Sequence, residues 1–159
     1  MERTKPPKQN ETQKMYRIPL VRVMMVKERN QASPIRRISN PEDAADMLQS
    51  FLAGADRENF VVVLLDTKNK VAGINTVSIG TLNSTVVHPR EVFKPAILAN
   101  AASIILAHNH PSGNLEPSME DKDVTRRLRQ AGDILGIKIL DHLIFGEEGF
   151  LSMLEGNLF

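Results

Sequence analysis

Two uninterrupted apolar runs are the features that most constrain how this 159-residue chain can fold. Residues 60–65 read FVVVLL and residues 103–107 read SIILA, and polar positions do not alternate through either run. A strand of this kind offers no face to solvent, so other elements must cover the sheet on both sides. The two runs therefore predict a layered α/β domain, with a mixed sheet flanked by helices.

Caps and apolar periodicity predict the elements around these runs. Polar caps or prolines mark three helix starts, and glycines are placed to end two of those helices. We expect helices over 41–53, 88–101 and 118–135, and strands over 18–26, 60–65, 71–79, 103–107, 137–145 and 150–153. The resulting order β-α-β-β-α-β-α-β-β combines hairpins with helical crossovers, as mixed sheets do.

The length suits one domain, and the first 17 residues differ from the rest of it. They carry five basic and two acidic residues, which leaves 15 basic and 17 acidic residues for the remainder. We expect residues 1–17 to be a flexible polar tail and residues 18–159 to form the domain. The formal charge of +1 therefore belongs to the tail, and the body is slightly acidic.

Composition also excludes several classes of site and partner. The chain has no cysteine, so any metal must be held by histidine and carboxylate, and disulfides and thiolate nucleophiles are excluded. A net charge near zero and an aromatic fraction of 4% do not support nucleic-acid binding. There is no apolar run of membrane-spanning length and no hydrophobic signal-peptide segment, so we expect a cytoplasmic protein without membrane contact.

Reactive side chains concentrate in residues 108–121, HNHPSGNLEPSMED. His108 and His110 are two positions apart at the end of a predicted strand, so their side chains point to the same face and Asn109 points away. Asp121 lies in the first turn of the next predicted helix, where the loop allows it to return to the strand end. Two imidazoles, a carboxylate and a water form a typical catalytic zinc site.

Each of these residues also has an ordinary structural explanation. Ser118 and Asp121 are spaced as a capping box, and a histidine pair at a strand end can be solvated or bonded to backbone. Spacing alone therefore leaves metal binding and a structural role both open. We expect His88 to face solvent or pack locally, and Asp141-His142 to form a structural hydrogen bond in preference to orienting a ligand.

The spacing His-x-His, seven residues, Ser-x-x-Asp resembles the JAMM metalloprotease motif at every position. The surrounding segments HPREVFKPAI (88–97), AHNHPSGNLEPSMED (107–121) and DHLIFG (141–146) are similar to the JAB domain of the bacterial RadC family. The resemblance covers residues 40–159 and implies a JAB/MPN, cytidine-deaminase-like layered fold.

The same resemblance implies a site and a reaction. One zinc ion per chain would be held by His108, His110 and Asp121, with a water as the fourth ligand. Glu91 would be the general base, and Ser118 would donate to the oxyanion of the tetrahedral intermediate. The implied reaction is hydrolysis of a peptide or isopeptide bond, so the expected partner is a peptide or protein substrate.

Further expectations concern the base, the alternative functions and the assembly. Glu91 is favoured as base over Glu116 and Glu120, which fit loop and helix-start roles. A DNA-associated role in repair or mobile elements, as a metal-dependent nuclease, is a second hypothesis, although the residues before position 40 leave no room for the helix-hairpin-helix region of longer RadC relatives. A non-catalytic interaction scaffold is a third. A homodimer is the default assembly for a small domain.

Overall fold

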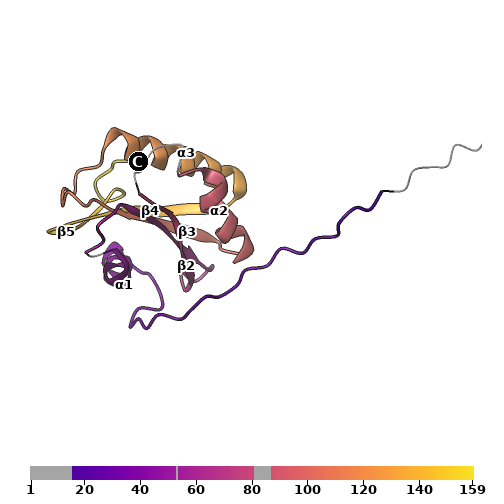
Figure 1. The fold of residues 1–159 in the computed structure, drawn as a ribbon. Coiled ribbons are helices and arrows are strands. Elements are labelled where there is room, and N and C mark those ends of the chain that lie inside the picture. Colours follow the sequence, from indigo (N-terminus) through magenta and orange to yellow (C-terminus); the bar gives the residue numbers. More distant parts are fainter. Residues whose placement is uncertain (1–15, 53, 81–86) are drawn as a thin grey trace, which may run out of the picture.

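The computed structural model describes residues 16–52, 54–80 and 87–159, and a five-stranded sheet lies at their centre. The strands are β1 (Asn59–Leu65), β2 (Val71–Ile79), β3 (Ser103–Asn109), β4 (Lys138–Gly146) and β5 (Gly149–Ser152). Three helices of the described residues cover them: α1 (Pro41–Leu52), α2 (Pro89–Leu98) and α3 (Met119–Leu135). α1 lies on one face of the sheet, and α2 and α3 lie on the other (Figure 1). The predicted mixed sheet flanked by helices is confirmed.

The strand order is β2-β1-β3-β4-β5. β1 pairs antiparallel with β2 and β3, β3 pairs parallel with β4, and β4 pairs antiparallel with β5. α3 connects the parallel pair, because parallel neighbours need a crossover and cannot be joined by a tight turn. In the β1–β3 pair Phe60 lies opposite His108, so the start of β1 lies beside the end of β3.

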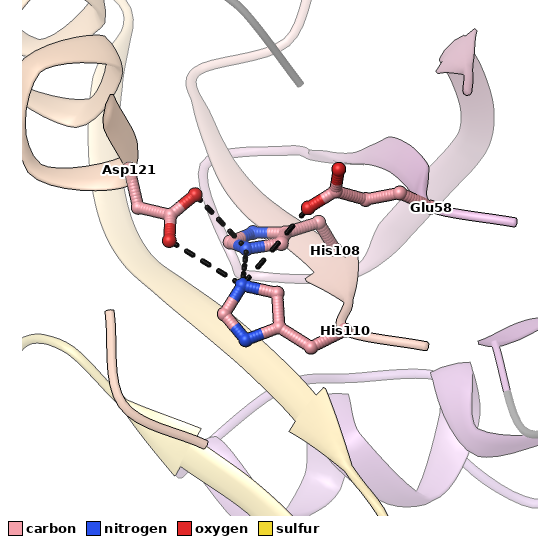
Figure 2. Close-up of side chains that lie close together, drawn as sticks. All are labelled: Glu58, His108, His110 and Asp121. Atoms are coloured by element: carbon pink, nitrogen blue, oxygen red, sulfur yellow. Dashed lines mark hydrogen bonds and ion pairs between the residues drawn. The ribbon is translucent and has the colours of Figure 1, made fainter. Parts of the chain in front are cut away.

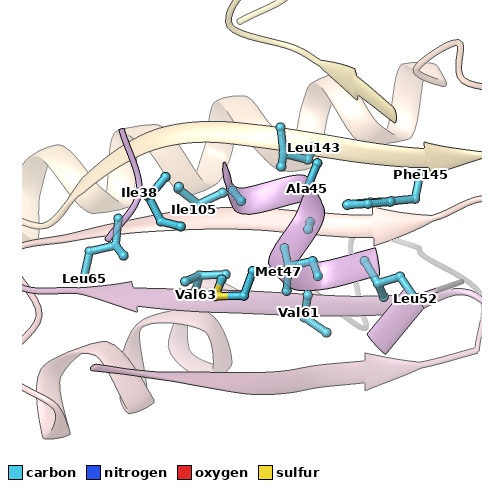
Figure 3. Close-up of a cluster of buried hydrophobic side chains, with 13 residues drawn as sticks. Ile38, Ala45, Met47, Leu52, Val61, Val63, Leu65, Ile105, Leu143 and Phe145 are labelled. Carbon is cyan, nitrogen blue, oxygen red and sulfur yellow. The ribbon is translucent and has the colours of Figure 1, made fainter. Parts of the chain in front are cut away.

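The β1 strand explains why both faces of the sheet are covered. Val61, Val63 and Leu65 point to the α1 side, where they join the same cluster as Met47 of that helix (Figure 3). The alternate residues of β1 point to the other side and join the apolar cluster that contains α2 and α3 residues. Every residue from Phe60 to Leu65 is at most 2% exposed. The uninterrupted apolar run is therefore buried on both faces, as predicted.

The helix ends follow the expected caps, with one difference. The side chain of Asn40 accepts from the Asp43 backbone N–H at 2.8 Å at the start of α1. Gly136 ends α3 in the left-handed region, with φ of 70°. α2 ends at Leu98, three residues early, because Asn100 adopts φ of 51° and turns the chain towards β3. None of the helices in the described residues combines the length and apolar composition needed to cross a bilayer.

The strand predicted over residues 18–26 is wrong. Described residues 16–34 belong to no helix or strand and are exposed, including Leu20 at 100% and Val21 at 82%. The segment runs away from the sheet in Figure 1, and no strand among the described residues pairs with its backbone. Apolar, β-branched composition favours a strand only where a partner edge is available. The predicted polar tail, residues 1–17, lies outside the described residues except for Tyr16 and Arg17.

Candidate metal centre

Four side chains from three separate parts of the chain meet at one end of the sheet (Figure 2). His108 and His110 come from the end of β3, and Asp121 comes from the first turn of α3. Glu58 comes from the residue before β1. One nitrogen or oxygen atom from each of the four lies within 4.8 Å of the others. The structure therefore brings together the three residues predicted as ligands and adds a second carboxylate.

The three predicted ligands are close enough to share one ion. Nε2 of His108 lies 3.0 Å from Nε2 of His110. The two Asp121 oxygens lie 3.2 Å from His108 Nε2 and 3.3 Å from His110 Nε2. A tetrahedral zinc ion with bonds of about 2.0–2.1 Å separates its ligand atoms by about 3.3 Å. The spacing of the three groups therefore fits a tetrahedral metal ion.

Glu58 was not predicted from the sequence, and its Oε1 lies 4.0 Å from Nε2 of His110. The position follows from strand pairing: Phe60 lies opposite His108, so residue 58 lies opposite residue 110 when the antiparallel register is continued. The signal was available in the sequence only as an acidic residue just before a buried strand. It could not be used without knowing that this strand pairs antiparallel with the strand that carries the histidines.

Glu91, the residue predicted as the base, is not a member of this group. It lies exposed in the first turn of α2, where the helix dipole favours an acidic side chain. Glu116 and Glu120 are also exposed and also lie outside the group. His88, the N-cap of α2, accepts a hydrogen bond from the Arg90 backbone N–H at 3.1 Å, so its expected local structural role is confirmed.

A family model described as the RadC-like JAB domain matches residues 38–158. The chain belongs to the RadC-like JAB domain family. A UPF0758 protein from Rubrobacter xylanophilus is 58% identical over 130 residues, which is 82% of this chain and 56% of that protein. A UPF0758 protein from Moorella thermoacetica is 59% identical over 121 residues, covering 76% of this chain and 53% of that protein. The chain thus spans about half the length of these curated relatives.

The hydrogen bonds of this JAB domain determine which histidine nitrogen faces the group. Nδ1 of His110 lies 2.6 Å from the carbonyl oxygen of Asn114, which can only accept. In the neutral ring Nδ1 must therefore carry the hydrogen, and the Nε2 lone pair points to Asp121 and His108. The loop after β3 thus orients one ligand by a main-chain contact.

Asp121 and Ser118 form the capping box that their spacing predicted. The Ser118 hydroxyl oxygen accepts from the Asp121 N–H at 3.0 Å, and the Ser118 N–H donates to Asp121 Oδ2 at 2.7 Å. The hydroxyl also donates to the same oxygen at 2.7 Å. The same hydrogen bonds therefore cap the start of α3 and orient the Asp121 carboxylate.

The charges of the JAB domain's site favour a cation between the ligands. Burial by itself would raise the pKa of Asp121, but hydrogen bonds from His108 and His110, formed when these rings carry a proton on Nε2, outweigh burial and hold that pKa well below the usual range. The hydrogen bond with Asp121 raises the pKa of His110, against the opposing effect of burial. A buried carboxylate beside two inward-facing nitrogens is stabilised by a proton or a metal ion.

The pair Asp141-His142 has two different roles. Asp141 is structural, since its carboxylate accepts from the Ser152 hydroxyl at 2.6 Å and from the Leu154 N–H at 3.0 Å, while burial raises its pKa. His142 instead contacts a predicted ligand, with Nε2 2.8 Å from Nδ1 of His108. Burial lowers the pKa of His142 well below its ordinary value, so that ring is neutral. His142 therefore has, besides its backbone bond to Asp141, a direct contact with a predicted ligand.

A cleft of about 580 Å³ opens beside His110. One wall comes from α1, including Asp46, and another from the segment 109–113, which contains His110. Phe145 and Phe150 of the last hairpin line a third side. The centres of their rings are 6.1 Å apart. The cleft has both apolar and polar walls, and of the four clustered side chains it includes His110.

Proposed function

We propose that this JAB domain is a zinc-dependent hydrolase of peptide or isopeptide bonds. The observation that carries the proposal is the 3.0–3.3 Å spacing of the His108, His110 and Asp121 ligand atoms. Imidazole and carboxylate ligands without cysteine suit a zinc site that keeps an open position for catalysis. As its partner we propose a peptide or protein substrate.

Zinc, when bound by these three residues, would lower the pKa of a water and polarise a scissile carbonyl. Glu58 would be the general base that accepts the proton of that water. Its Oε1 is 4.0 Å from His110 Nε2, the nitrogen that would bind the zinc, so this carboxylate would lie within reach of a zinc-bound water. Glu58 would accept the proton at Oε1 and deliver it to the leaving amine.

Glu58 replaces Glu91 as the base in this proposal. A general base must lie within hydrogen-bond reach of the proton it removes, directly or through one water. Glu58 is 21% exposed, which leaves its carboxylate accessible to substrate while its neighbours hold it beside His110. Glu91 has no such contact with the group, and its position is accounted for by the start of α2.

Ser118 would assist at the developing oxyanion. Its hydroxyl donates to Asp121 Oδ2 at 2.7 Å, so the hydroxyl must turn towards the substrate to fill this role. A peptide would approach through the cleft beside His110, with its scissile carbonyl reaching the metal position past the segment 109–113.

Metal content measured on protein without a histidine tag tests the proposal first. We expect about one zinc ion per chain in the wild type and a loss of zinc in His110→Ala. His88→Asn is the matched control, because it removes a histidine outside the site and keeps a side chain that can cap α2. A wild-type protein that takes up no stoichiometric zinc would overturn the metalloenzyme proposal.

A substrate screen tests the reaction. Zinc-loaded wild type and Glu58→Gln are incubated with peptide libraries and with isopeptide-linked conjugates, and new amino termini are identified by mass spectrometry. We expect products from the wild type and none from Glu58→Gln at equal zinc content. Identical products from both proteins would show that Glu58 is not the base, and none from either would count against hydrolysis.

A further inference from the structure

A buried chain of hydrogen bonds runs from the backbone of α3 to the ligand His108. The Thr125 hydroxyl oxygen lies 2.6 Å from the carbonyl oxygen of Asp121 and 2.6 Å from Nδ1 of His142. Nε2 of His142 lies 2.8 Å from Nδ1 of His108. Thr125, His142 and His108 are all 0% exposed, so water does not compete for these bonds.

The chemistry of the groups fixes the direction of every bond in this chain. The Asp121 carbonyl can only accept, so the one hydrogen of the Thr125 hydroxyl lies between these two oxygens. The Thr125 oxygen must then accept from Nδ1–H of His142. A neutral imidazole has a single N–H, so Nε2 of His142 accepts from Nδ1–H of His108.

The reverse direction fails at its first step. It would require the Thr125 hydroxyl to donate to His142, which would leave two oxygens 2.6 Å apart with no hydrogen between them. A second acceptor near the hydroxyl, the Met153 sulfur at 3.7 Å, is longer and weaker. The only arrangement that satisfies the three contacts from the Asp121 carbonyl through Thr125 and His142 to His108 leaves the Nε2 lone pair of His108 facing Asp121 and His110.

We propose that Thr125 and His142 are positioning residues that fix the tautomer of His108 for metal binding. In His110 a main-chain carbonyl accepts from Nδ1–H and so fixes the same tautomer. In His108 the acceptor is instead a second, neutral histidine. The acceptor adds no negative charge to the site, which leaves Asp121 as the charged ligand. This inference rests on the metal-binding part of the proposed function and is independent of the substrate.

Packing holds the rings in place but does not select the tautomer. Phe60 stacks on His108 with ring centres 6.1 Å apart and planes at 11°, and its edge packs against His142 at 5.4 Å. These contacts restrict rotation of both rings. They do not distinguish Nδ1–H from Nε2–H, so the hydrogen bonds to His142 and Thr125 decide which nitrogen faces the metal.

Thr125→Val is the decisive variant, because it removes the hydroxyl and keeps the branched shape, and Thr125→Ser is the matched control that keeps the hydroxyl. Long-range ¹H–¹⁵N NMR of the metal-free protein at about pH 8, above the ordinary histidine pKa, reports the tautomers. We expect Nδ1–H at His108 and His142 in the wild type and Thr125→Ser, and a mixture in Thr125→Val. Cobalt(II) titration should show affinity about 10–100-fold weaker in Thr125→Val and nearly unchanged in Thr125→Ser.

A second pair of variants covers the case in which Thr125→Val does not fold. His142→Gln keeps an acceptor oxygen for His108 Nδ1–H, and His142→Phe removes it, so only His142→Phe should lose cobalt affinity. The inference is overturned if His108 carries its hydrogen on Nε2 in the metal-free wild type, or if both members of a pair bind cobalt equally. Failure of the proposed function gives a different result, because the NMR assignment uses neither metal nor substrate.

Discussion

Asn109 hydrogen-bonds to the backbone on both sides of Glu58. Its Nδ2 donates to the Arg57 carbonyl at 3.0 Å, and its Oδ1 accepts from the Asn59 N–H at 2.8 Å. Asn109 stands between the two histidines in sequence and points away from them, as strand alternation requires. The end of β3 and the residue after it therefore supply two of the predicted metal ligands, and the Asn109 side chain between them holds the segment that carries Glu58.

Asn109→Ala is expected to reduce hydrolysis while zinc content is kept. The substitution removes the partner of the Asn59 N–H and should lower the free energy of unfolding by about 1 kcal/mol. The segment that carries Glu58 would then lose its fixed place beside His110. Asn59→Ala is the control, because it removes only the 2.9 Å bond from the Asn59 side chain to the Arg57 carbonyl. Equal activity in the two variants, measured at equal zinc content, would contradict the positioning role of Asn109.

Glu58→Gln and Glu91→Gln separate the two candidate bases. Removing a general base typically costs about 10²–10⁴-fold in kcat, so Glu58→Gln should be nearly inactive. Glu91→Gln should retain its activity, because that side chain is exposed at the start of α2. Initial rates on a peptide found by the screen, with zinc content measured on each sample, decide between them. The opposite pattern would restore Glu91 as the base.

Ser118→Ala is expected to affect both stability and the metal centre. Loss of an N-cap costs about 0.5–2 kcal/mol, and the Asp121 carboxylate would also lose the hydroxyl that donates to it at 2.7 Å. Asn40→Ala removes the corresponding cap of α1 and serves as the control. Urea unfolding should show similar losses for the two variants, whereas only Ser118→Ala should weaken zinc binding. A loss of zinc affinity in both would indicate a global effect.

Metal affinity should depend on pH through His110. Its pKa is raised by the hydrogen bond with Asp121, and a proton on Nε2 occupies the position that the metal needs. Affinity should therefore be constant above the raised pKa and fall by about tenfold per pH unit below it. The decline should begin above the ordinary histidine value of 6.5. Cobalt(II) titrations between about pH 5.5 and 8.5 measure this, and a flat profile down to 6.5 would contradict it.

The same shift affects the stability of the metal-free protein. A histidine whose pKa is raised in the folded state stabilises the fold fully below its unfolded value of 6.5 and loses that effect as pH rises through the folded value. Wild-type protein should therefore lose stability relative to His110→Gln between about pH 6 and 8, measured by thermal unfolding with chelator present. A constant difference over this range would show that the His110–Asp121 interaction does not contribute.

Gly132→Ala tests the packing of α3 away from the site. A Cβ at this position would lie 2.5 Å from the Ile137 carbonyl oxygen and 3.2 Å from Cζ of Phe93, so the helix would have to move. We expect a loss of about 1–3 kcal/mol in urea unfolding. Gly73→Ala is the control, because its Cβ would meet Leu64 Cδ1 at an ordinary 3.7 Å. Equal stability of the two variants would show that α3 tolerates the extra methyl group.

The elements that were predicted correctly have local causes. The FVVVLL run predicted β1 because uninterrupted apolar residues of that length have no other stable position. Asn40, Ser118 and Gly136 marked helix ends because capping depends on a few neighbouring groups. That His108, His110 and Asp121 lie together could be predicted for the same reason, since the two histidines are two positions apart at a strand end and Asp121 follows within one loop.

The features that were predicted wrongly or not predicted at all depend on partners distant in sequence. Residues 18–26 have the composition of a strand, but whether a strand forms depends on a free edge, which local composition does not report. Glu58 is 50 residues before His108, and only the antiparallel register of β1 and β3 brings it to the histidines. The link from Thr125 to His142 and His108 likewise joins α3, β4 and β3.

The sequence by itself determined a layered α/β domain, the absence of cysteine ligands and the three residues that meet at one end of the sheet. Those features depend on composition, on the periodicity of apolar residues and on short-range spacing. Only the tertiary structure decided which carboxylate lies beside His110 and which nitrogen of His108 faces Asp121. Both depend on strand register and on buried hydrogen bonds between distant segments, and a hydrogen bond is specified by atomic positions that the sequence does not contain.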